Sequence, residues 1–513
     1  MPQSIIRSRA MITRTLSRTT WEQIDDGAVL QTDGVIQAIG SFASLSAAHP
    51  NVPVVGSDNE IMLPGFVNAH HHIGLTPVQL GSPDMPLELW FITRLVMRNV
   101  DLYLDTLYSA FEMIASGVTT VQHIQSVLPG SLAEVQQKVG QIIKAYEDIG
   151  MRVSYCYSVR DQNRLVYQSD DEFVASLPRE LQEPLRRHFA RFKPSLDEIM
   201  GLFRDLYAQH GAKRRVRIQL APANLHWCSD RALTALSDAS VKYGVPMHMH
   251  LVETAFQKEY AKRRGRCTAL EYIDRFGLVN ERLTIGHGVW LTERDIERLA
   301  AAGSCVCHNC SSNFRLRSGI APLNEFENRG VATAIGIDEA GINDDRDMLQ
   351  EMRMVLRAHR VPGLAEEDVP TVAQVMRMAT AGGARTTPFG STIGTLEVGK
   401  AADLVLIDWK HIAYPYLDAE TPLLDAVIQR AKSGGVTLTM CDGEIVYENG
   451  RFTKVDRTAA LAALHSDLNK ALSSHEIERR KLSMTLLPYV RSFYADYIDP
   501  ERSEAFYRPN ART

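Results

Sequence analysis

The sequence predicts an α/β protein in which a TIM-type (β/α)8 barrel is inserted into a small composite β-sandwich domain. Eight short apolar runs between residues 61 and 389 alternate with longer helical patterns, and eight such repeats close a barrel of this type. Strand-like sequence with glycine turns flanks this region on both sides. The 513 residues also exceed the length of one ordinary domain.

The flanking segments predict the sandwich and a tail. Residues 1–60 contain alternating apolar stretches such as AVLQTDGVIQAIG, which are typical of short antiparallel strands. Residues 390–453 return to strands in TIGTLEVGKAADLVLIDW and GVTLTMCDGEIVYENGRF, with glycine-based turns between them. Residues 454–513 predict a helical tail, with an Ala/Leu-rich helix followed by a basic one.

Between these segments, residues 61–389 supply the eight predicted barrel strands. The runs are IMLPGFVNA, GVTTVQHI, MRVSYCYS, VRIQLAP, VPMHMH, LTIGHGV, SCVCH and VATAIGID. The connection from about residue 159 to 215 is the longest and most charged, so we expect it to contain helices of its own.

Composition and charge limit the possible partners. The chain is 45% hydrophobic and 23% charged, as in soluble globular proteins, and its net charge is −5. This charge gives no basis for binding nucleic acid or an anionic membrane, and no apolar run reaches the roughly 18 residues that span a bilayer. Seven cysteines at low density indicate a reducing compartment. We therefore expect a cytoplasmic protein with a small-molecule substrate.

Histidines stand at the end of the first predicted barrel strand, in the run Asn68-Ala69-His70-His71-His72. Side chains two residues apart on a strand share a face. His70 and His72 therefore point together into the barrel mouth, where the reactive groups of such barrels lie, while His71 points away. This pattern predicts a chelating pair.

Three more strand ends carry candidate groups. The fifth ends in HMHLVE (248–253), the sixth in GHG around His287, and the eighth in GID at Asp338. Imidazoles and a carboxylate from several strand ends form a site for one divalent metal, zinc or iron. His248 and His250 both face inward, and position favours His250. Glu253 reaches the site only if the chain has turned, which suits a proton shuttle.

The segment SCVCHNC (304–310) allows a second interpretation. Its cysteines and His308 resemble a zinc knuckle, but no second pair follows at the spacing of a zinc finger. The segment also fits a short buried strand that runs into a loop, and free cysteine is common in cores. We favour the buried strand.

Six segments together resemble the amidohydrolase superfamily. They are LPGFVNAHHH, HMHLVET, IGHGV, HNCSSNFRLRSGIAP, IGIDEAGINDDRDM and IGTLEVGKAADLVLID. They occur in order over about residues 1–450 and are most similar to one branch of it. That branch holds triazine chlorohydrolases, hydroxyatrazine-type hydrolases, methylthioadenosine, guanine and cytosine deaminases, and arylurea hydrolases.

The resemblance implies roles for individual residues. The implied metal ligands are His70, His72, His250 and Asp338. Asp338 and His287 would orient a metal-activated water molecule, and Glu253 would relay protons. His308 and Asn313 match a stretch that lines the pocket. No lysine stands in or just after the third or fourth strand, where a bridging carboxylated lysine would be expected, so the resemblance implies a single ion.

The chain also departs from the purine deaminases of this family. In PANLHWCS (222–229), Ala223 stands where those enzymes usually have a histidine, so a nucleoside substrate loses one expected contact. Glu339 follows Asp338 and is either a solvated loop residue or a second acid near the pocket mouth. His226 and Trp227 could stack on a planar ligand, although core packing fits Trp227 equally well.

We therefore expect an enzyme, a metal-dependent hydrolase of carbon–nitrogen bonds other than peptide bonds. Its substrate would be a small planar nitrogen compound, an amino-heterocycle, arylamide or arylurea. The same metal site serves several reactions, so hydrolytic dehalogenation or desulfurisation is the alternative. A non-catalytic scaffold would be expected to lose its ligands, and this chain keeps them. The resemblance also suggests a homo-oligomer, a dimer or higher.

Overall fold

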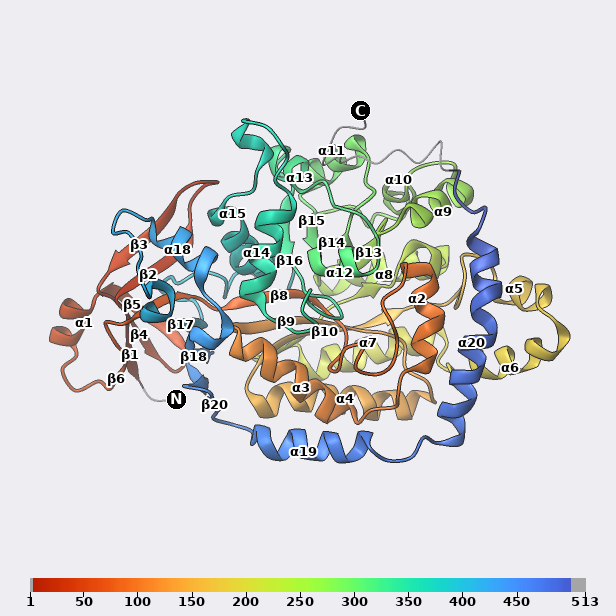
Figure 1. Ribbon diagram of the computed structural model, residues 1–513, viewed down its shortest axis with the longest axis horizontal. Helices are drawn as coiled ribbons and strands as arrows, with labels where there is room; N and C mark the ends of the chain where they lie inside the picture. Colours follow the sequence, from red (N-terminus) through yellow and green to blue (C-terminus); the bar gives the residue numbers. More distant parts are fainter. Residues whose placement is uncertain (1–2, 500–513) are drawn as a thin grey trace.

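The computed structural model describes residues 3–499 and shows a mixed α/β protein (Figure 1). A β-rich unit, built from both ends of the chain, lies beside a larger unit in which strands are surrounded by helices. A helical tail runs from the β-rich unit along the outside of the larger unit (Figure 1). The order of these parts along the chain agrees with the order that the sequence predicts.

The larger unit contains eight parallel strand positions, the fourth of which is shared by two short strands. In chain order they are β8 (Phe66–His71), β9 (Val118–Gln125), β10 (Arg152–Val159), β11 (Val216–Ile218) with β12 (Ala221–Pro222), β13 (Met247–Leu251), β14 (Leu283–His287), β15 (Cys305–His308) and β16 (Ala332–Ile335). They pair in the orders β11-β10-β9-β8 and β13-β14-β15-β16. Parallel bridges Leu220–Met247 and His71–Asp338 join the two sheets, so the pairing continues from β16 back to β8.

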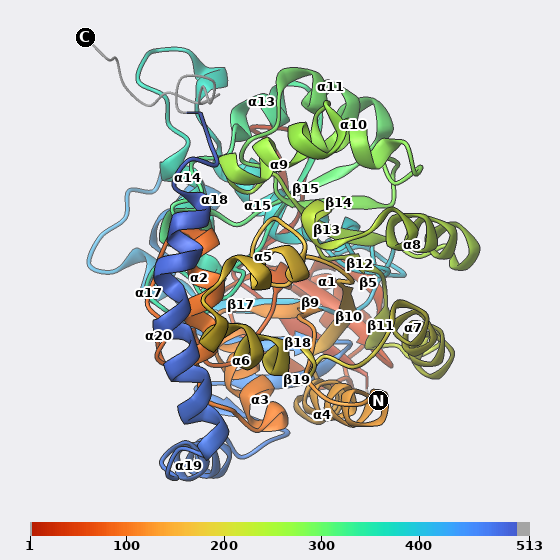
Figure 2. The same ribbon diagram turned by 90° about the vertical axis from the view of Figure 1, so that its right-hand side faces the viewer.

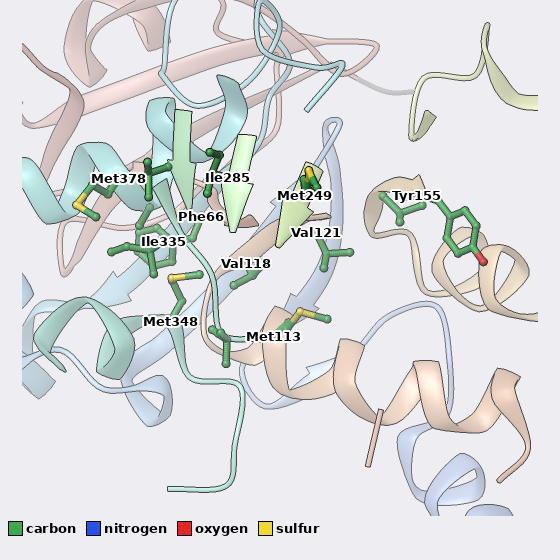
Figure 3. Packing of buried hydrophobic residues seen from close by; sticks show 14 of the residues in the cluster. Phe66, Met113, Val118, Val121, Tyr155, Met249, Ile285, Ile335, Met348 and Met378 are labelled. Atoms are coloured by element: carbon green, nitrogen blue, oxygen red, sulfur yellow. The ribbon is translucent and has the colours of Figure 1, made fainter. Parts of the chain in front are cut away.

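Successive side chains of each strand point alternately to the surrounding hydrophobic core and to the inside of the ring. Met249, Ile285 and Ile335, from β13, β14 and β16, lie in the main hydrophobic core (Figure 3). Met249 lies between His248 and His250, so the two histidines point to the opposite face of β13. The same alternation on β8 separates His71 from its neighbours. It therefore delivers imidazoles to the inside of the ring of strands.

Helices follow the strands as the sequence predicts. The longer ones around the ring are α3 (Leu102–Ala115), α4 (Leu132–Ile149), α6 (Arg179–Phe189), α7 (Leu196–His210), α8 (Asp230–Tyr243), α9 (Ala255–Gly265), α11 (Glu293–Ala302) and α14 (Met348–Ala358). The shorter ones are α2 (Leu87–Thr93), α5 (Asp170–Ser176), α10 (Ala269–Asp274), α12 (Cys310–Arg315), α13 (Leu323–Asn328), α15 (Val372–Arg377) and α16 (Gly383–Arg385). The long connection after β10 thus contains α5, α6 and α7.

The β-rich unit consists of two sheets. The first pairs β5 (Val35–Ser41), β4 (Gly27–Thr32), β1 (Ser4–Arg7) and β6 (Val54–Gly56) in that order. The second pairs β20 (Arg451–Phe452), β19 (Glu444–Glu448), β18 (Val436–Cys441), β17 (Leu404–Asp408), β7 (Glu60–Pro64), β2 (Ala10–Thr15) and β3 (Trp21–Asp25). Residues of both sheets share one core. The second sheet is therefore completed by strands from both ends of the chain.

Two predicted strands differ from the structure. The run IMLPGFVNA is divided at Gly65, so that β7 joins the mixed sheet and only β8 enters the ring. A Cβ on Gly65 would lie 2.4 Å from the Thr119 side chain, so the chain passes close to β9 at this point. The stretch TIGTLEVGK forms turns rather than a strand, with positive φ at Gly394 and Gly399.

The tail contains α19 (Arg457–Leu468) and α20 (Ser474–Tyr494), as its sequence predicts. Helix α20 lies beside α2 and the α5–α6 connection (Figure 2). Leu486, Val490 and Tyr494 share a separate hydrophobic core with residues of those helices. Residues 500–513 of the predicted tail lie outside the described part. Between residues 3 and 499, no helix is long and apolar enough to cross a membrane.

Candidate metal centre and its cavity

Nitrogen atoms of three histidines converge inside the ring. His70 Nε2 lies 3.0 Å from His72 Nε2, which lies 3.1 Å from His250 Nε2. Asp338 Oδ1 is 3.2 Å from His72 Nε2, and Asp338 Oδ2 is 3.7 Å from His287 Nε2. All five side chains are largely buried. The four strand ends that the sequence singles out therefore meet at one point.

The strand alternation at His70-His71-His72 is confirmed. His70 and His72 face the same point, whereas His71 Nε2 lies 3.3 Å from the Ser109 hydroxyl on α3. The backbone N–H of Asp338 donates to the carbonyl of His70 at 2.8 Å. The contact that joins β8 to the end of β16 thus also brings two of the candidate ligands together.

Hydrogen bonds fix which nitrogen of each imidazole faces inward. His72 Nδ1 donates to the Ile124 carbonyl at 2.6 Å, and His250 Nδ1 donates to the Ala223 carbonyl at 2.9 Å. A carbonyl oxygen only accepts, so Nδ1 carries a proton, and in its neutral form each ring presents the lone pair of Nε2 to the centre. This second set of partners is typical of histidines that bind metals.

The donor set fits a divalent cation. Two neutral imidazoles that face each other with lone pairs at 3.1 Å repel each other unless a cation lies between them. A proton on one Nε2 forms a hydrogen bond to only one neighbouring atom, whereas several ligand atoms converge at this point. A tetrahedral zinc ion with bonds of about 2.0–2.1 Å holds its ligand nitrogens about 3.3 Å apart, close to the separations seen. Three imidazoles and a carboxylate suit zinc or iron.

His248 takes a different position from His250. Its Nε2 lies 2.8 Å from His70 Nδ1, on the side of that ring away from the centre. It therefore orients His70, while His250 faces the other ligands. Gly286 makes room for this pair, because a Cβ there would lie 2.9 Å from His70 Cε1. The geometry supports the choice of His250 that position along the strand suggests.

Unusual backbone conformations occur at three of these strand ends. Val252, His287 and Asp338 have φ values of 43°, 72° and 63°. A positive φ in a residue other than glycine costs on the order of 1 kcal/mol or more and persists only where the surroundings impose it. At Val252 the turn ends β13 and brings Glu253 inward. This is the turn that Glu253 needs in order to reach the site.

The Asp338 and His287 side chains are held by residues of α12, the helix that follows β15. Ser312 Oγ donates to Asp338 Oδ2 at 2.6 Å, and His287 Nδ1 lies 2.9 Å from Asn313 Oδ1. Burial acts to raise the pKa of Asp338, but hydrogen bonds with His72 and Ser312 and the electrostatic attraction of the His72 and His287 imidazoles bring it well below its ordinary value. Asp338 is therefore ionised. Burial lowers the pKa of His287, which is neutral near pH 7.

Glu253 has the opposite character. It is buried, accepts a hydrogen bond from Ser318 Oγ at 3.1 Å, and places Oε2 3.7 Å from His287 Nε2. Its backbone N–H donates to Gln257 Oε1 at 2.9 Å. Burial, and then the charges of Asp338 and Glu88, raise its pKa well above the ordinary value. A carboxyl group that keeps its proton near neutral pH is suited to general acid catalysis.

A cavity of about 390 Å³ opens from this centre, and His72, His250, Glu253, His287 and Asp338 line it. Trp227 and Glu339 also line it. Glu339 is buried and pairs with Arg94 at 2.9 Å, so it is a second acid at the cavity rather than a solvated loop residue. Aromatic, aliphatic and arginine side chains form much of the rest of its lining.

The other predicted substrate contacts lie behind the cavity wall. His226 packs against Tyr167, with ring centres 4.1 Å apart, and His308 Nε2 lies 2.7 Å from His359 Nε2. Asn313 contacts His287 rather than the open cavity. Cys305 and Cys307 lie on β15, and Cys310 begins α12; all three are buried and free. Donor atoms of His308, Cys310 and His359 also lie within 4.8 Å of one another.

Sequence reasoning missed three residues that hold the site in place. Ser312, Ser318 and Gln257 each contact a candidate ligand or Glu253. It singled out His248, but as an alternative ligand rather than as the partner of His70. Ser312 and Ser318 lie within HNCSSNFRLRSGIAP, so that motif contains a signal for them. Gln257 lies one helical turn after Glu253, on α9. Its role follows only from the turn at Val252.

Comparison with known proteins assigns the chain to a family. The model of the amidohydrolase family matches residues 61–446, and the chain belongs to this family. It is thus an enzyme of the metal-dependent hydrolase class that acts on carbon–nitrogen bonds other than peptide bonds, as the sequence predicts.

Curated relatives are similar over most of their length. A 5-methylthioadenosine/S-adenosylhomocysteine deaminase from Pyrococcus furiosus is 28% identical over 84% of this chain and 93% of the relative. A 5′-deoxyadenosine deaminase from Methanosphaera stadtmanae is 25% identical over 86% of this chain and 94% of the relative.

Solved structures share the fold. An adenosine deaminase from Xanthomonas campestris with bound zinc has a TM-score of 0.74 at 24% identity, covering 91% of this chain and 97% of that one. An atrazine chlorohydrolase from Arthrobacter aurescens complexed with zinc has a TM-score of 0.77 at 20% identity, covering 90% and 99%. The similarity therefore extends through the whole α/β unit.

Proposed function

We propose that this enzyme is a zinc-dependent deaminase of an amino-substituted nitrogen heterocycle. One divalent ion per chain, zinc or otherwise iron, is held by His70, His72, His250 and Asp338. The site lies in a (β/α)8 barrel of residues 61–389, inserted into a composite β-sandwich of residues 1–60 and 390–453. We also propose a homo-oligomer in the cytoplasm.

The convergence of Nε2 atoms supports the proposal most strongly. His72 and His250 place these atoms 3.1 Å apart while each Nδ1 is bound to a backbone carbonyl. A cation between these atoms removes the repulsion of their lone pairs, whereas packing alone gives no reason to bring them together. A non-catalytic scaffold has no need of these ligands.

The chain's own residues divide the chemistry. A divalent ion held here would lower the pKa of a water molecule to about 7 and so supply a nucleophile near neutral pH. Asp338 is ionised and His287 neutral, so both accept protons and can orient that water. Glu253 starts protonated and donates to a ring nitrogen or to the departing amine. Its burial keeps the proton available in the absence of substrate.

The heterocycle is supported by relatives whose names describe deaminases of adenosine derivatives. Ala223 removes one contact that purine deaminases usually make, but its carbonyl holds His250. The neighbouring atrazine chlorohydrolase structure keeps hydrolytic dehalogenation as the second candidate. The two functions differ in the group released, ammonia or halide.

A substrate panel tests the proposal. Zinc-loaded protein would be incubated with 5′-methylthioadenosine, adenosine, guanine, an aminotriazine, a chlorotriazine and an arylurea, with products identified by mass. We expect ammonia release from an amino-heterocycle. Chloride release alone would transfer the assignment to the dehalogenase, and arylamine release alone to the arylurea hydrolase. Turnover of none of them by fully metal-loaded protein would contradict the proposal.

A further inference from the structure

The cavity has two chemically different ends. The carboxyl groups that line it belong to Glu253, Asp338 and Glu339, and all three lie at the metal end. Arginines also line it, and they are Arg94, Arg98, Arg160, Arg164, Arg191 and Arg479. Arg94 is paired with Glu339. We name the other five the arginine end.

The positive charge of the arginine end is only partly balanced. Arg98 lies 3.7 Å from Glu476, and Arg164 lies 3.7 Å from Asp170. Glu476 also accepts the hydrogen bonds of the capping box that starts α20. Five guanidinium groups thus face two carboxylates, each at the outer limit of an ion pair.

The remaining three arginines bind only neutral partners or none. Arg160 donates to the carbonyls of Asn163 and Arg164, and Arg479 donates to the Met97 carbonyl and to Asn99 Oδ1 at 3.0 Å. Within residues 3–499, the Arg191 side chain has neither a hydrogen bond nor an ion pair. A partly buried guanidinium without a partner is costly, because it has lost water without gaining an acceptor.

Two of these arginines lie close enough to His188 to affect its protonation. Burial, followed by the charges of Arg191 and Arg479, lowers the pKa of His188 to about 4. His188 also lines the cavity, and its Nδ1 is buried without a partner among the described residues. Arg160 lies 4.2 Å above the ring of Trp227. The region therefore offers several unfilled donors around a single space.

Two of the arginines come from segments outside the strand–helix repeats. Arg191 follows α6 in the long connection after β10, and Arg479 lies on α20 of the tail. The core shared by α20, α5 and α6 holds these segments together. Phe91, Phe189 and Phe192 also line the cavity. An elongated ligand therefore meets the metal centre, an apolar wall and a cluster of cations.

We propose that the arginine end binds an anionic substituent of the substrate, a carboxylate or a phosphate, remote from the amino group that is released. Guanidinium groups bind both anions through paired N–H donors, and an uncharged substituent would leave those donors without acceptors. The inference rests on the proposed function for the nature of the other end of the ligand.

Matched substrates test the inference. The probes are 5′-methylthioadenosine, its analogue in which a carboxyethyl group replaces the methyl, and adenosine 5′-monophosphate. For each zinc-loaded protein, the ratio of kcat/KM for an anionic probe to kcat/KM for 5′-methylthioadenosine is measured. We expect a ratio of at least about 10 for one anionic probe, which also distinguishes carboxylate from phosphate. In Arg191→Gln this ratio should fall about 10- to 100-fold, the effect of a hydrogen bond to a charged group.

Two exposed cations are matched controls. Arg187 lies one turn before Arg191 and contacts only Glu183, at 3.9 Å, and Lys481 lies near Arg479 on α20. Arg187→Gln and Lys481→Gln should keep the wild-type ratio. An unchanged ratio in Arg191→Gln, with an unchanged Tm, would overturn the inference. So would a wild-type ratio near 1 for both anionic probes.

Calorimetry separates this inference from the proposed function. If no adenosine probe is deaminated, the proposed function fails for aminopurines, and binding of the same probes to the zinc-loaded protein is measured instead. Tighter binding of an anionic probe than of 5′-methylthioadenosine, lost in Arg191→Gln but kept in Arg187→Gln, supports the arginine end on its own. Equal binding of all three probes overturns it.

Discussion

The two ends of the cavity differ in how the sequence encodes them. The metal end comes from short motifs at four strand ends, and nearly every donor there is held by a defined partner. The arginine end comes from four separate segments between Arg98 and Arg479, and several of its donors have no partner. The difference teaches that the reactive groups of this chain are specified locally, whereas the shape and charge of the substrate site depend on long-range packing.

Removal of a metal ligand should have the largest effect on activity, and it should act only at the metal end of the cavity. In His250→Ala we expect loss of bound zinc and a fall in kcat/KM of more than about 10³-fold, since a metal contributes several kcal/mol to the barrier. Metal analysis and initial rates measure this. His71→Asn is the control, because His71 faces Ser109. Full activity of zinc-free His250→Ala would contradict the ligand assignment.

Replacement of Glu253 should lower the rate of the chemical step without affecting zinc binding. Glu253→Gln keeps the shape and the hydrogen bond of Ser318 but cannot transfer a proton. We expect kcat to fall about 10²–10⁴-fold while zinc content stays near that of the wild type. Single-turnover rates and metal analysis measure both. A kcat near the wild-type value would remove Glu253 from the mechanism.

His248 lies behind His70, and its replacement should have a smaller effect than the loss of a ligand. His248→Phe removes the partner of His70 Nδ1 and should weaken zinc binding about 10- to 100-fold. Competition with a chelator measures the affinity. Met249→Leu on the same strand is the control, because Met249 belongs to the hydrophobic core. If His248→Phe lost all zinc and His250→Ala kept it, the two assignments would be reversed.

Replacement of Asp105 should have the smallest effect, a change in how the free energy of unfolding depends on pH. It is buried and accepts hydrogen bonds from the N–H groups of Gly74 and Leu75, in the loop after His72. Burial raises the pKa of Asp105 to about 6. A raised carboxyl pKa favours the protonated folded form, so this stability is present below about pH 4 and is lost as the pH rises through 6. Urea unfolding should show Asp105→Asn losing about 1 kcal/mol less than the wild type between pH 5 and 7. Parallel pH profiles would contradict this.

Much of the fold could be predicted because strand periodicity is local. All eight barrel runs overlap a strand of the ring, and both tail helices form where the sequence places them. The errors have physical causes. IMLPGFVNA reads as one apolar strand, but Gly65 allows a close crossing over Thr119 that divides it. TIGTLEVGK alternates like a strand, but two glycines with positive φ turn it.

The candidate site divides in the same way. His70, His72, His250, Glu253, His287 and Asp338 come together because each stands at a strand end. His226 and His308 carry the right chemistry, yet their side chains pack against Tyr167 and His359. Arg191 and Arg479 carried no signal, because nothing in a local pattern shows that α6 and α20 meet. Dimerisation, cytoplasmic location and the identity of the ion stay predictions.

The position of the ion tests the central claim most directly. Crystals of zinc-loaded protein would be measured at the zinc absorption edge. The account predicts one anomalous peak per chain, bonded to His70, His72, His250 and Asp338 at about 2.0–2.2 Å. A peak at His308, Cys310 and His359 instead, or no peak in active crystals, would contradict it.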